Sequence, residues 1–483
     1  MKKSKKLIRI LKDAEIEQIH QKSLHLLKRV GIKVEDEEIR ERLQDSGCQV
    51  EGERVKLNPE LVAKVIDHRR DNNQVNFCSW NGITEEVEKG KVISHSFGTV
   101  PEIIDYQTGE KRKAYLSDLK SVILLMDRLE YVDMPTAMLY PDDIPPQLSQ
   151  IKMTEYLLRY SSKPVSGPGG GSPEETRYIL ELFKAFKGGR DKLGENPIGT
   201  IHVSPESPLY YPQPILDTMK LIIKTGIPTK MLICPITGIS APMTITGGLT
   251  QMNASMLAFC VISYLINPDT PVVYGSRLAF ANMKTGHSIW GLPEVGIAGV
   301  CAVQLADYYG LPSDVYGLST TSCAFDNQSG YEKAVNGLLP ILAGSNFVSG
   351  LGGIASGTVA SYEQLVIDNE TYSVLLKVAQ GVDLTEESIG LDVIFDVIMN
   401  GGNYLAQEHT VKYLRDGEIF IPQVGFDGLW QEWEAEGKKT IRDKAREVIE
   451  TELDAAEKTM LADEVDQEVE RIVASAQQEL VTG

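Results

Sequence analysis

Seven short runs of apolar or small residues recur between about residue 90 and residue 350, and helical patterns lie between most of them. The runs span residues 92–97, 163–167, 198–203, 229–234, 270–275, 314–318 and 346–350. The helical patterns include residues 174–186, 211–224, 249–265 and 292–309. Strands that alternate with helices of this length favour βαβ units and a parallel sheet. Seven or eight such units without a dinucleotide-binding fingerprint predict an α/β fold of the (β/α)8 barrel type.

The length of the chain allows one barrel with additions at both ends. It has 483 residues, and a barrel needs about 250–400. Residues 1–88 predict a helical or α+β N-terminal cap, and residues 89–428 predict the barrel core. Residues 429–483 are charged, with apolar positions every three or four residues, which predicts a helical tail that packs on the barrel or forms an oligomer.

The charge and the cysteines limit the partners and the compartment. The net charge is −19, which argues against nucleic acid and against an anionic membrane surface. Six cysteines are scattered without a C-x-x-C pair, which predicts a reduced, cytoplasmic protein. The basic N-terminus lacks an apolar core of signal length, and no run of about 18 apolar residues predicts a membrane span.

The loops that follow the predicted strands hold the candidate chemistry. One of them, residues 321–333, reads TSCAFDNQSGYEK and leads from an apolar run into a helical pattern. In a barrel, the substrate site lies at the carboxyl ends of the strands. The glycine-rich stretch 167–171 lacks the ending of a phosphate loop. Since the histidines are widely spaced, we expect no metal site, and the absence of a G-x-S-x-G motif argues against a serine nucleophile.

Aromatic residues at the predicted strand ends offer two interpretations. Each one alone most often belongs to a packed core. Together they could form a cage for a quaternary ammonium, which ring faces attract by about 0.5–2 kcal/mol per ring. Arg277, just past one strand, could hold a substrate carboxylate or make a surface ion pair.

Several ordered stretches resemble the trimethylamine methyltransferase family. They include GISAPMTITGGLTQMNA at 238–254, NPDTPVVYG at 267–275, DNQSGYEKA at 326–334, LAGSNFV at 342–348 and EQLVIDNE at 363–370. The resemblance covers roughly residues 10–430. It implies a barrel that moves a methyl group from a methylamine to the cobalt of a corrinoid on a partner protein, with no cofactor bound permanently. It also implies a place in methanogenic or acetogenic one-carbon metabolism.

The resemblance assigns candidate residues one by one. Asp326, Gln328 and Glu332 match the family's D-x-Q-x-G-[YF]-E motif and are the expected catalytic-loop residues. His409 matches a late His-Thr motif and could bond a neighbouring loop or reach the substrate or corrinoid. Candidates for the ring wall are Phe97, Tyr274, Trp290, Phe325, Tyr331 and Phe347. Candidates for the substrate carboxylate are Arg277, His202 and Asn346.

The loop before this motif decides the expected substrate class. The founding members carry pyrrolysine there, whereas residues 320–325 read TTSCAF. The chain therefore resembles the non-pyrrolysine branch, which demethylates betaine-type quaternary amines such as glycine betaine, proline betaine or carnitine. A quaternary ammonium leaves as a neutral amine, so the protein needs orientation rather than acid catalysis. The alternatives are a barrel that only binds a quaternary amine, a trimethylamine methyltransferase, and a metal-dependent hydrolase or lyase.

Overall fold

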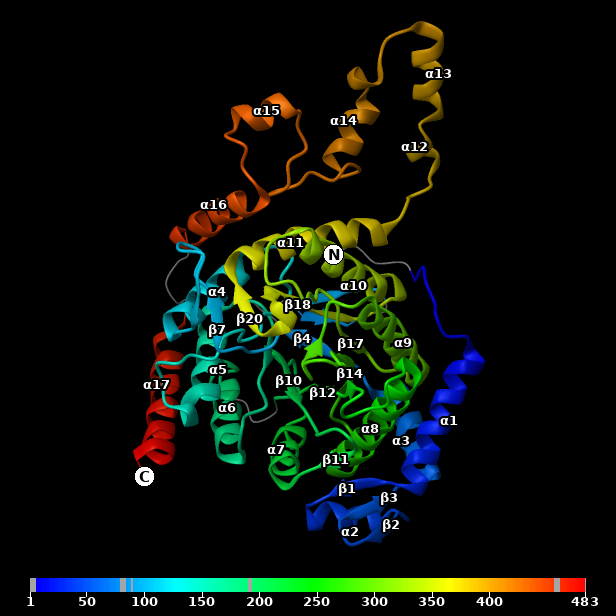
Figure 1. The fold of residues 1–483 in the computed structure, drawn as a ribbon, viewed down its shortest axis with the longest axis vertical. Helices are drawn as coiled ribbons and strands as arrows, with labels where there is room; N and C mark the ends of the chain where they lie inside the picture. Colours follow the sequence, from blue (N-terminus) through cyan, green and yellow to red (C-terminus); the bar gives the residue numbers. More distant parts are fainter. Residues whose placement is uncertain (1–5, 79–83, 88–89, 190–192, 456–460, 483) are drawn as a thin grey trace.

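The computed structural model describes residues 6–78, 84–87, 90–189, 193–455 and 461–482, and its centre is a parallel β-barrel (Figure 1). Seven strands form one sheet in the order β6-β18-β17-β14-β12-β10-β9. They are β6 (Ile93–Ser96), β9 (Val165–Gly167), β10 (Gly199–Val203), β12 (Thr229–Ile233), β14 (Val272–Ser276), β17 (Ser313–Tyr316) and β18 (Phe347–Leu351). Each coincides with a run predicted from the sequence, so the α/β barrel prediction is confirmed.

A short extended segment closes the barrel between its two edge strands. Met134 bridges to His95 of β6, and Thr136 bridges to Ser166 of β9, both in parallel. The sequence did not predict this eighth position. Pro135 lies between the two bridging residues and has no N–H to donate to a ladder, so the segment does not form a continuous strand.

Eight helices surround the barrel. They are α4 (Leu116–Arg128), α5 (Ser149–Tyr160), α6 (Pro173–Phe186), α7 (Gln213–Lys224), α8 (Ile245–Ile266), α9 (Pro293–Tyr309), α10 (Asn327–Ala343) and α11 (Tyr362–Gln380). By length and composition, α8 is apolar enough to cross a membrane, which the sequence analysis did not anticipate. However, α8 packs against α1 (Asp13–Arg29), α3 (Pro59–Asn72) and the barrel strands, which accounts for its apolar character.

The barrel interior is filled at its amino-terminal end and open above. Ile93, Met134, Val273 and Phe347 form a cluster with Phe77 of strand β4 (Asn76–Cys78). The rings of Phe77 and Phe347 meet edge to face, with centroids 6.0 Å apart. Since side chains alternate along a strand, residues two positions further along point into the upper part of the barrel.

The N-terminal segment forms a small α+β unit beside the barrel. It contains α1, β1 (Ile32–Val34), α2 (Glu37–Asp45), β2 (Gln49–Glu51), β3 (Arg54–Lys56) and α3. Strand β11 (Tyr210–Tyr211), from a barrel loop, pairs with β1 and joins the two parts in one sheet.

Two small sheets are built from the loops above the barrel strands. One contains β13 (Ile236–Thr237), β15 (Ala279–Ala281) and β16 (Ser288–Ile289). The other contains β7 (Glu102–Ile104), β8 (Lys111–Lys113), β19 (Gly353–Ile354) and β20 (Val359–Ser361).

The chain leaves the barrel after α11 and then returns to it. Residues 382–421, here called the arm, contain α12 (Glu386–Ile389), α13 (Leu391–Asn400) and α14 (Glu408–Arg415), and project from the barrel wall (Figure 1). After α15 (Trp430–Ala435), helix α16 (Ile441–Asp454) packs on α11 and α4. Helix α17 (Asp463–Gln477) packs on α6 and α5, so both tail helices bury their apolar residues on the chain's own barrel.

Candidate active site

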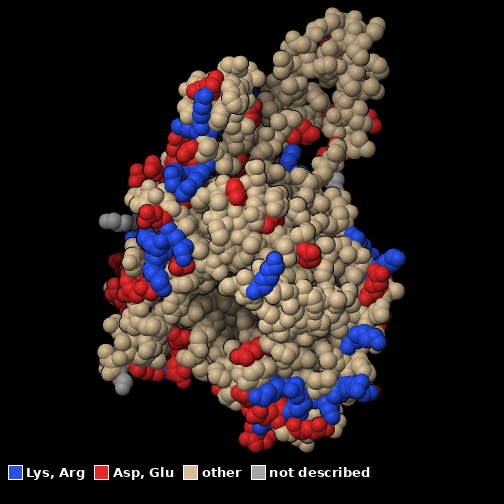
Figure 2. All heavy atoms as spheres, in the orientation of Figure 1, with Lys and Arg blue, Asp and Glu red and all other residues tan. Residues whose placement is uncertain are grey.

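A cavity of about 490 Å³ opens at the carboxyl ends of the barrel strands. Figure 2 shows the molecular surface hollowed over this part of the barrel, with few charged side chains at the visible rim. It is lined by residues that alternate inward along the seven strands and the closing segment: His95 and Phe97, Thr136, Ser166, His202 and Ser204, Cys234, Arg277, Tyr316, and Ser349. The volume lies in the range of small-molecule sites.

A buried carboxylate organises the charges at the floor of the cavity. The Asp314 side chain has no exposed surface, and its carboxylate lies 2.7 Å from Arg277 Nη2 and 2.9 Å from Lys230 Nζ. The Nε2 atom of His95 lies 3.1 Å from the same carboxylate. Burial alone would raise the pKa of Asp314, but Arg277, Lys230 and His95 hold it well below its usual value. Asp314 is therefore a permanent anion.

The two histidines of the cavity are neutral. Burial, with the charge of Lys230, lowers the pKa of both His95 and His202 to about 4. The Nδ1 atom of His95 lies 3.0 Å from the Ser96 carbonyl, so both ring nitrogens face acceptors. A neutral ring carries one proton, and we place it on Nε2 because the carboxylate is the stronger acceptor.

Arg277 points back towards the floor and keeps donors for a ligand. Its Nη1 donates to the carbonyls of Ser276 and Asp314, and its Nη2 donates to the Asp314 carboxylate. A guanidinium has five N–H groups, so these three bonds leave others that a bound molecule in the cavity can reach.

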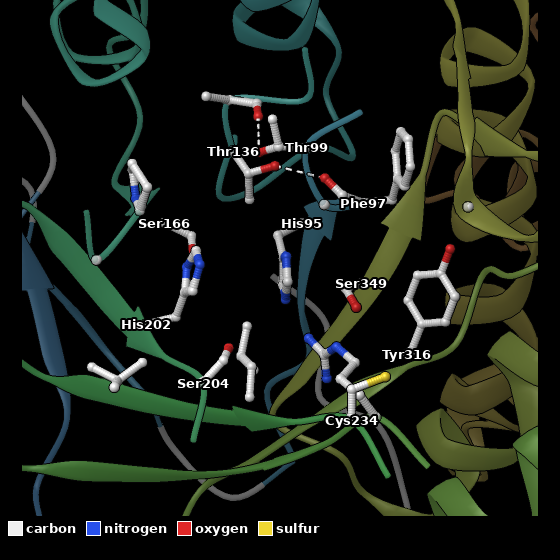
Figure 3. Close-up of a pocket in the computed structure, with 18 of the residues that line it drawn as sticks. His95, Phe97, Thr99, Thr136, Ser166, His202, Ser204, Cys234, Tyr316 and Ser349 are labelled. Atoms are coloured by element: carbon white, nitrogen blue, oxygen red, sulfur yellow. Dashed lines mark hydrogen bonds between the residues drawn. The ribbon is translucent and has the colours of Figure 1, made fainter. Parts of the chain in front are cut away.

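Aromatic rings form one wall of the cavity. Trp290 and Tyr316 meet edge to face, with centroids 4.9 Å apart. Phe97 lies on the same side, opposite His202 (Figure 3). Gly357 has φ +71°, and a Cβ there would come within 3.0 Å of the Tyr316 hydroxyl. Glycine at this position therefore lets the backbone approach the rings closely.

The predicted motif residues support the loops above the cavity. Glu332 accepts hydrogen bonds from Thr320 Oγ1 and the Thr321 N–H, while Gln328 donates to its other oxygen. Asp326 caps α10 by accepting from the Ser329 N–H.

This loop is tied in turn to the loop that contains Gly357. The Ser356 N–H donates to the Thr320 carbonyl, and the Ala355 N–H donates to the Ser322 carbonyl. Ala355 and Ser356 both have positive φ, a costly conformation that such ties maintain. The motif therefore acts on the cavity through Ser356 and Gly357, and Asp326, Gln328 and Glu332 do not line it.

Some of the predicted binding residues line the cavity and the others do not. Phe97, His202, Arg277 and Trp290 line the cavity together. Tyr274 points outward and bonds Asn253, while Asn346 and Phe347 lie at the amino-terminal end of β18.

The other three predicted binding residues lie outside the barrel. Phe325 lies under the Arg442 guanidinium, 4.4 Å from its ring centroid. Tyr331 is exposed on α10. His409 lies in the arm, where its Nε2 contacts the Glu387 carbonyl.

Asp314, Lys230, His95 and Tyr316 belong to the site but were not among the residues predicted from the sequence. Asp314 and Lys230 are charged residues within otherwise apolar strands, which is the signal that could have identified them. A fully buried charge is rare unless it is paired, so such residues point to a partner inside the barrel. Among the described residues, no group of three or more His, Cys, Asp or Glu side chains is arranged to hold a metal ion.

Comparisons with a family model and with known proteins point to the same family. The family model described as trimethylamine methyltransferase (MTTB) matches residues 1–481. Trimethylamine methyltransferase MttB of Desulfitobacterium hafniense is 30% identical over 442 residues, covering 90% of this chain and 87% of the relative. Glycine betaine methyltransferase of D. hafniense is 28% identical, covering 89% of each chain. Proline betaine:corrinoid methyltransferase of Eubacterium limosum is also 28% identical, covering 86% of this chain and 88% of the relative.

A solved structure supports the fold. The monomethylamine methyltransferase of Methanosarcina barkeri aligns over 97% of this chain and 88% of its own, with a TM-score of 0.52 and 11% identity. At that identity the likeness concerns the barrel architecture alone.

Proposed function

Because this chain belongs to the trimethylamine methyltransferase family and is a methyltransferase, we propose that it demethylates a carboxylated quaternary amine of the betaine type. The acceptor is the Co(I) of a corrinoid carried by a partner protein. One observation carries the proposal: a single cavity combines a guanidinium that has unused donors with a wall of aromatic rings. Trimethylamine has no group for the guanidinium to bind.

The charges orient such a substrate. Arg277 and Lys230 together outweigh Asp314, so the floor favours the carboxylate and repels the ammonium. The rings of Phe97, Trp290 and Tyr316 attract a cation that cannot donate a hydrogen bond. The carboxylate then lies deep, and a methyl group of the ammonium faces the mouth.

The chemistry needs no acid or base from the protein. The bond between nitrogen and the departing methyl breaks with its electron pair on nitrogen, so a neutral tertiary amine remains in the cavity. This agrees with the neutral state of His95 and His202. The protein contributes by holding one N–CH₃ bond in line with the acceptor and by excluding water.

The cavity also fits the proposed role of the corrinoid. A space of about 490 Å³ encloses a small amine but not a tetrapyrrole. The corrinoid, which supplies the strong Co(I) nucleophile, therefore approaches the mouth while its own protein carries it. Cys48, Cys234, Cys260, Cys301 and Cys323 are thiols rather than disulfides, which supports the cytoplasm as the location.

The test is a reaction of the purified protein with a Co(I) corrinoid under anaerobic conditions. We expect loss of the Co(I) absorption with glycine betaine, proline betaine or carnitine, together with an equal amount of demethylated amine by mass spectrometry. Trimethylamine should give no reaction. Turnover of trimethylamine without any betaine would reverse the substrate class, and tight betaine binding without transfer would favour a binding protein.

A further inference from the structure

The arm exposes an unusual amount of apolar surface. Residues 381–423 include none that is buried, and thirteen large apolar side chains of the arm are exposed by 42–83% each. Helix α13 shows the pattern most clearly, since Leu391, Phe395, Ile398 and Met399 recur at helical spacing on one stripe. A monomeric soluble protein rarely exposes an apolar patch of more than a few hundred Å².

The arm is a formed structure rather than a loose linker. His409 Nε2 contacts the Glu387 carbonyl, and Lys412 pairs with the Glu387 carboxylate, so α14 is tied to α12. At the base of the arm, Lys377 of α11 donates to the Gly417 carbonyl. The apolar stripe is therefore presented in a fixed shape.

The barrel wall beside the arm has a second apolar surface. Tyr331 and Val335 of α10, four residues apart, are 60% and 42% exposed. Val374 and Val378 of α11, also four residues apart, are 38% and 49% exposed. Helices α10 and α11 pack against each other and lie where the arm leaves the barrel (Figure 1). We call these four exposed side chains the α10–α11 face.

We propose that the arm docks on the α10–α11 face of a second copy of this chain, and that the second copy's arm docks in return. The exchange forms a dimer with twofold symmetry, because each copy offers both surfaces. A stable homodimer needs roughly 20–30 residues a side, and an arm of 40 residues with the adjoining face meets that requirement.

The character of the surface favours a permanent partner over a transient one. Interfaces that form and dissociate are about as polar as ordinary protein surface, while permanent homodimer interfaces are more apolar. The tail helices are not available for this role, because Ala445, Ile449, Val469 and Ile472 are buried on the chain's own barrel. The tail has the first of its two predicted roles, packing on the barrel, and the proposed oligomer contact is the arm.

The test is the mass of the full chain in solution at micromolar concentration, by light scattering and analytical ultracentrifugation. We expect twice the chain mass of 53.3 kDa. The double variant Phe395→Glu/Ile398→Glu, and separately Val374→Glu on the receiving face, should raise the dimer dissociation constant at least about 30-fold, since central apolar contacts dominate such interfaces. Met283→Glu, at a side chain that is 69% exposed elsewhere, is the matched control and should stay dimeric.

Two results would overturn the proposal. One is a monomeric wild-type chain at these concentrations, including one whose arm binds a different macromolecule. The other is a dimer that survives the arm variant. Thermal unfolding of each variant shows whether the barrel is intact. We expect an intact barrel because the substituted side chains are exposed. Betaine demethylation is not a readout here, so an error in the proposed substrate would leave this result unchanged.

Discussion

Two buried aspartates in this molecule have the same kind of partner and different surroundings. Asp314 and Asp368 have no exposed side-chain surface, and each pairs with a buried lysine, Lys230 and Lys333 respectively. Around Asp368, protein groups take up the hydrogen bonds of both the carboxylate and the lysine. Lys333 donates to the carbonyls of Leu318 and Gly350 and to Asp368, which also accepts from the Gly352 N–H and from Gln364.

The Asp314 cluster is instead open on one side. Arg277 joins it from the cavity wall, and neutral imidazoles lie beside it. The difference teaches that burial of a charge does not by itself mark a ligand site. A cluster whose donors are all used supports the fold, while a cluster that retains donors towards a cavity is suited to binding.

The largest effect should come from breaking the closed pair. Asp368→Asn leaves the Lys333 ammonium buried without a counter-charge, and we expect a loss of about 3–5 kcal/mol in the free energy of unfolding. Denaturant unfolding measures it. The double variant Lys333→Met/Asp368→Leu removes both charges and should recover much of the loss. A cost below about 1 kcal/mol for Asp368→Asn would mean that the pair is not structural.

The neutral histidines of the open cluster should make the stability of the protein fall in mild acid. Burial, with the charge of Lys230, lowers the pKa of His202 to about 4, while an unfolded histidine has a pKa of about 6.5. Between these two pKa values, the imidazole is protonated in the unfolded chain and neutral in the folded protein. The stability that neutral His202 contributes is complete above pH 6.5 and is lost as the pH falls. The loss reaches roughly 3 kcal/mol at pH 4.

His202→Gln should remove about half of the slope that the two neutral histidines give the unfolding free energy in urea between pH 7 and pH 4.5, since His95 keeps its own share. His25→Gln, at an exposed histidine of α1, is the control and should leave the slope unchanged. An unchanged slope in His202→Gln would show that the imidazole is already protonated in the folded protein.

A medium effect should come from the guanidinium of the open cluster. Arg277→Gln removes a charged partner of the substrate carboxylate, worth about 1.5–3 kcal/mol, so betaine binding should weaken roughly 10- to 100-fold. Arg277→Lys should be intermediate, because an ammonium lacks the planar fork. Since the carboxylate contact is the same before and during transfer, KM should rise more than kcat falls. Equal betaine affinity in both variants would remove Arg277 from the site.

The smallest effect should come from the ring wall. Trp290→Leu removes one ring face, and we expect a loss of about 0.5–2 kcal/mol in betaine binding by calorimetry. Tyr316→Phe keeps its ring and should lose less. The uncharged analogue 3,3-dimethylbutanoate, in which carbon replaces nitrogen, separates attraction of the cation from simple contact. If Trp290→Leu weakens both ligands equally, the wall supplies contact only.

The barrel could be predicted from the sequence because its strands and helices repeat a local pattern. The closing segment at Met134 and Thr136 could not, since Pro135 interrupts the apolar run that marks the other strands. The arm was also hidden. Its helical patterns resemble those of the barrel region, and only the folded structure shows that many of their apolar side chains are exposed.

About half of the candidate site could also be predicted from the sequence. Composition selected aromatic residues, but the side on which a strand residue points depends on its register. Tyr274 lies only three residues before Arg277 and therefore faces the helices, where it bonds Asn253. Tyr316 lies two residues after Asp314, points to the same side of β17 and lines the cavity. Alternation counted from one known inward residue would have separated the two tyrosines.

The way in which the barrel closes has a consequence for ligand size. Between β6 and β9 the circumference depends on isolated bridges rather than on a full ladder, and side-chain hydrogen bonds such as the one between Ser96 and Thr136 support them. Thr136 and Ser166, on either side of this seam, also line the cavity. The residues that complete the circumference are therefore also residues that bound the ligand space, so a bulkier side chain at Thr136 would alter the closure of the barrel and the width of the cavity together.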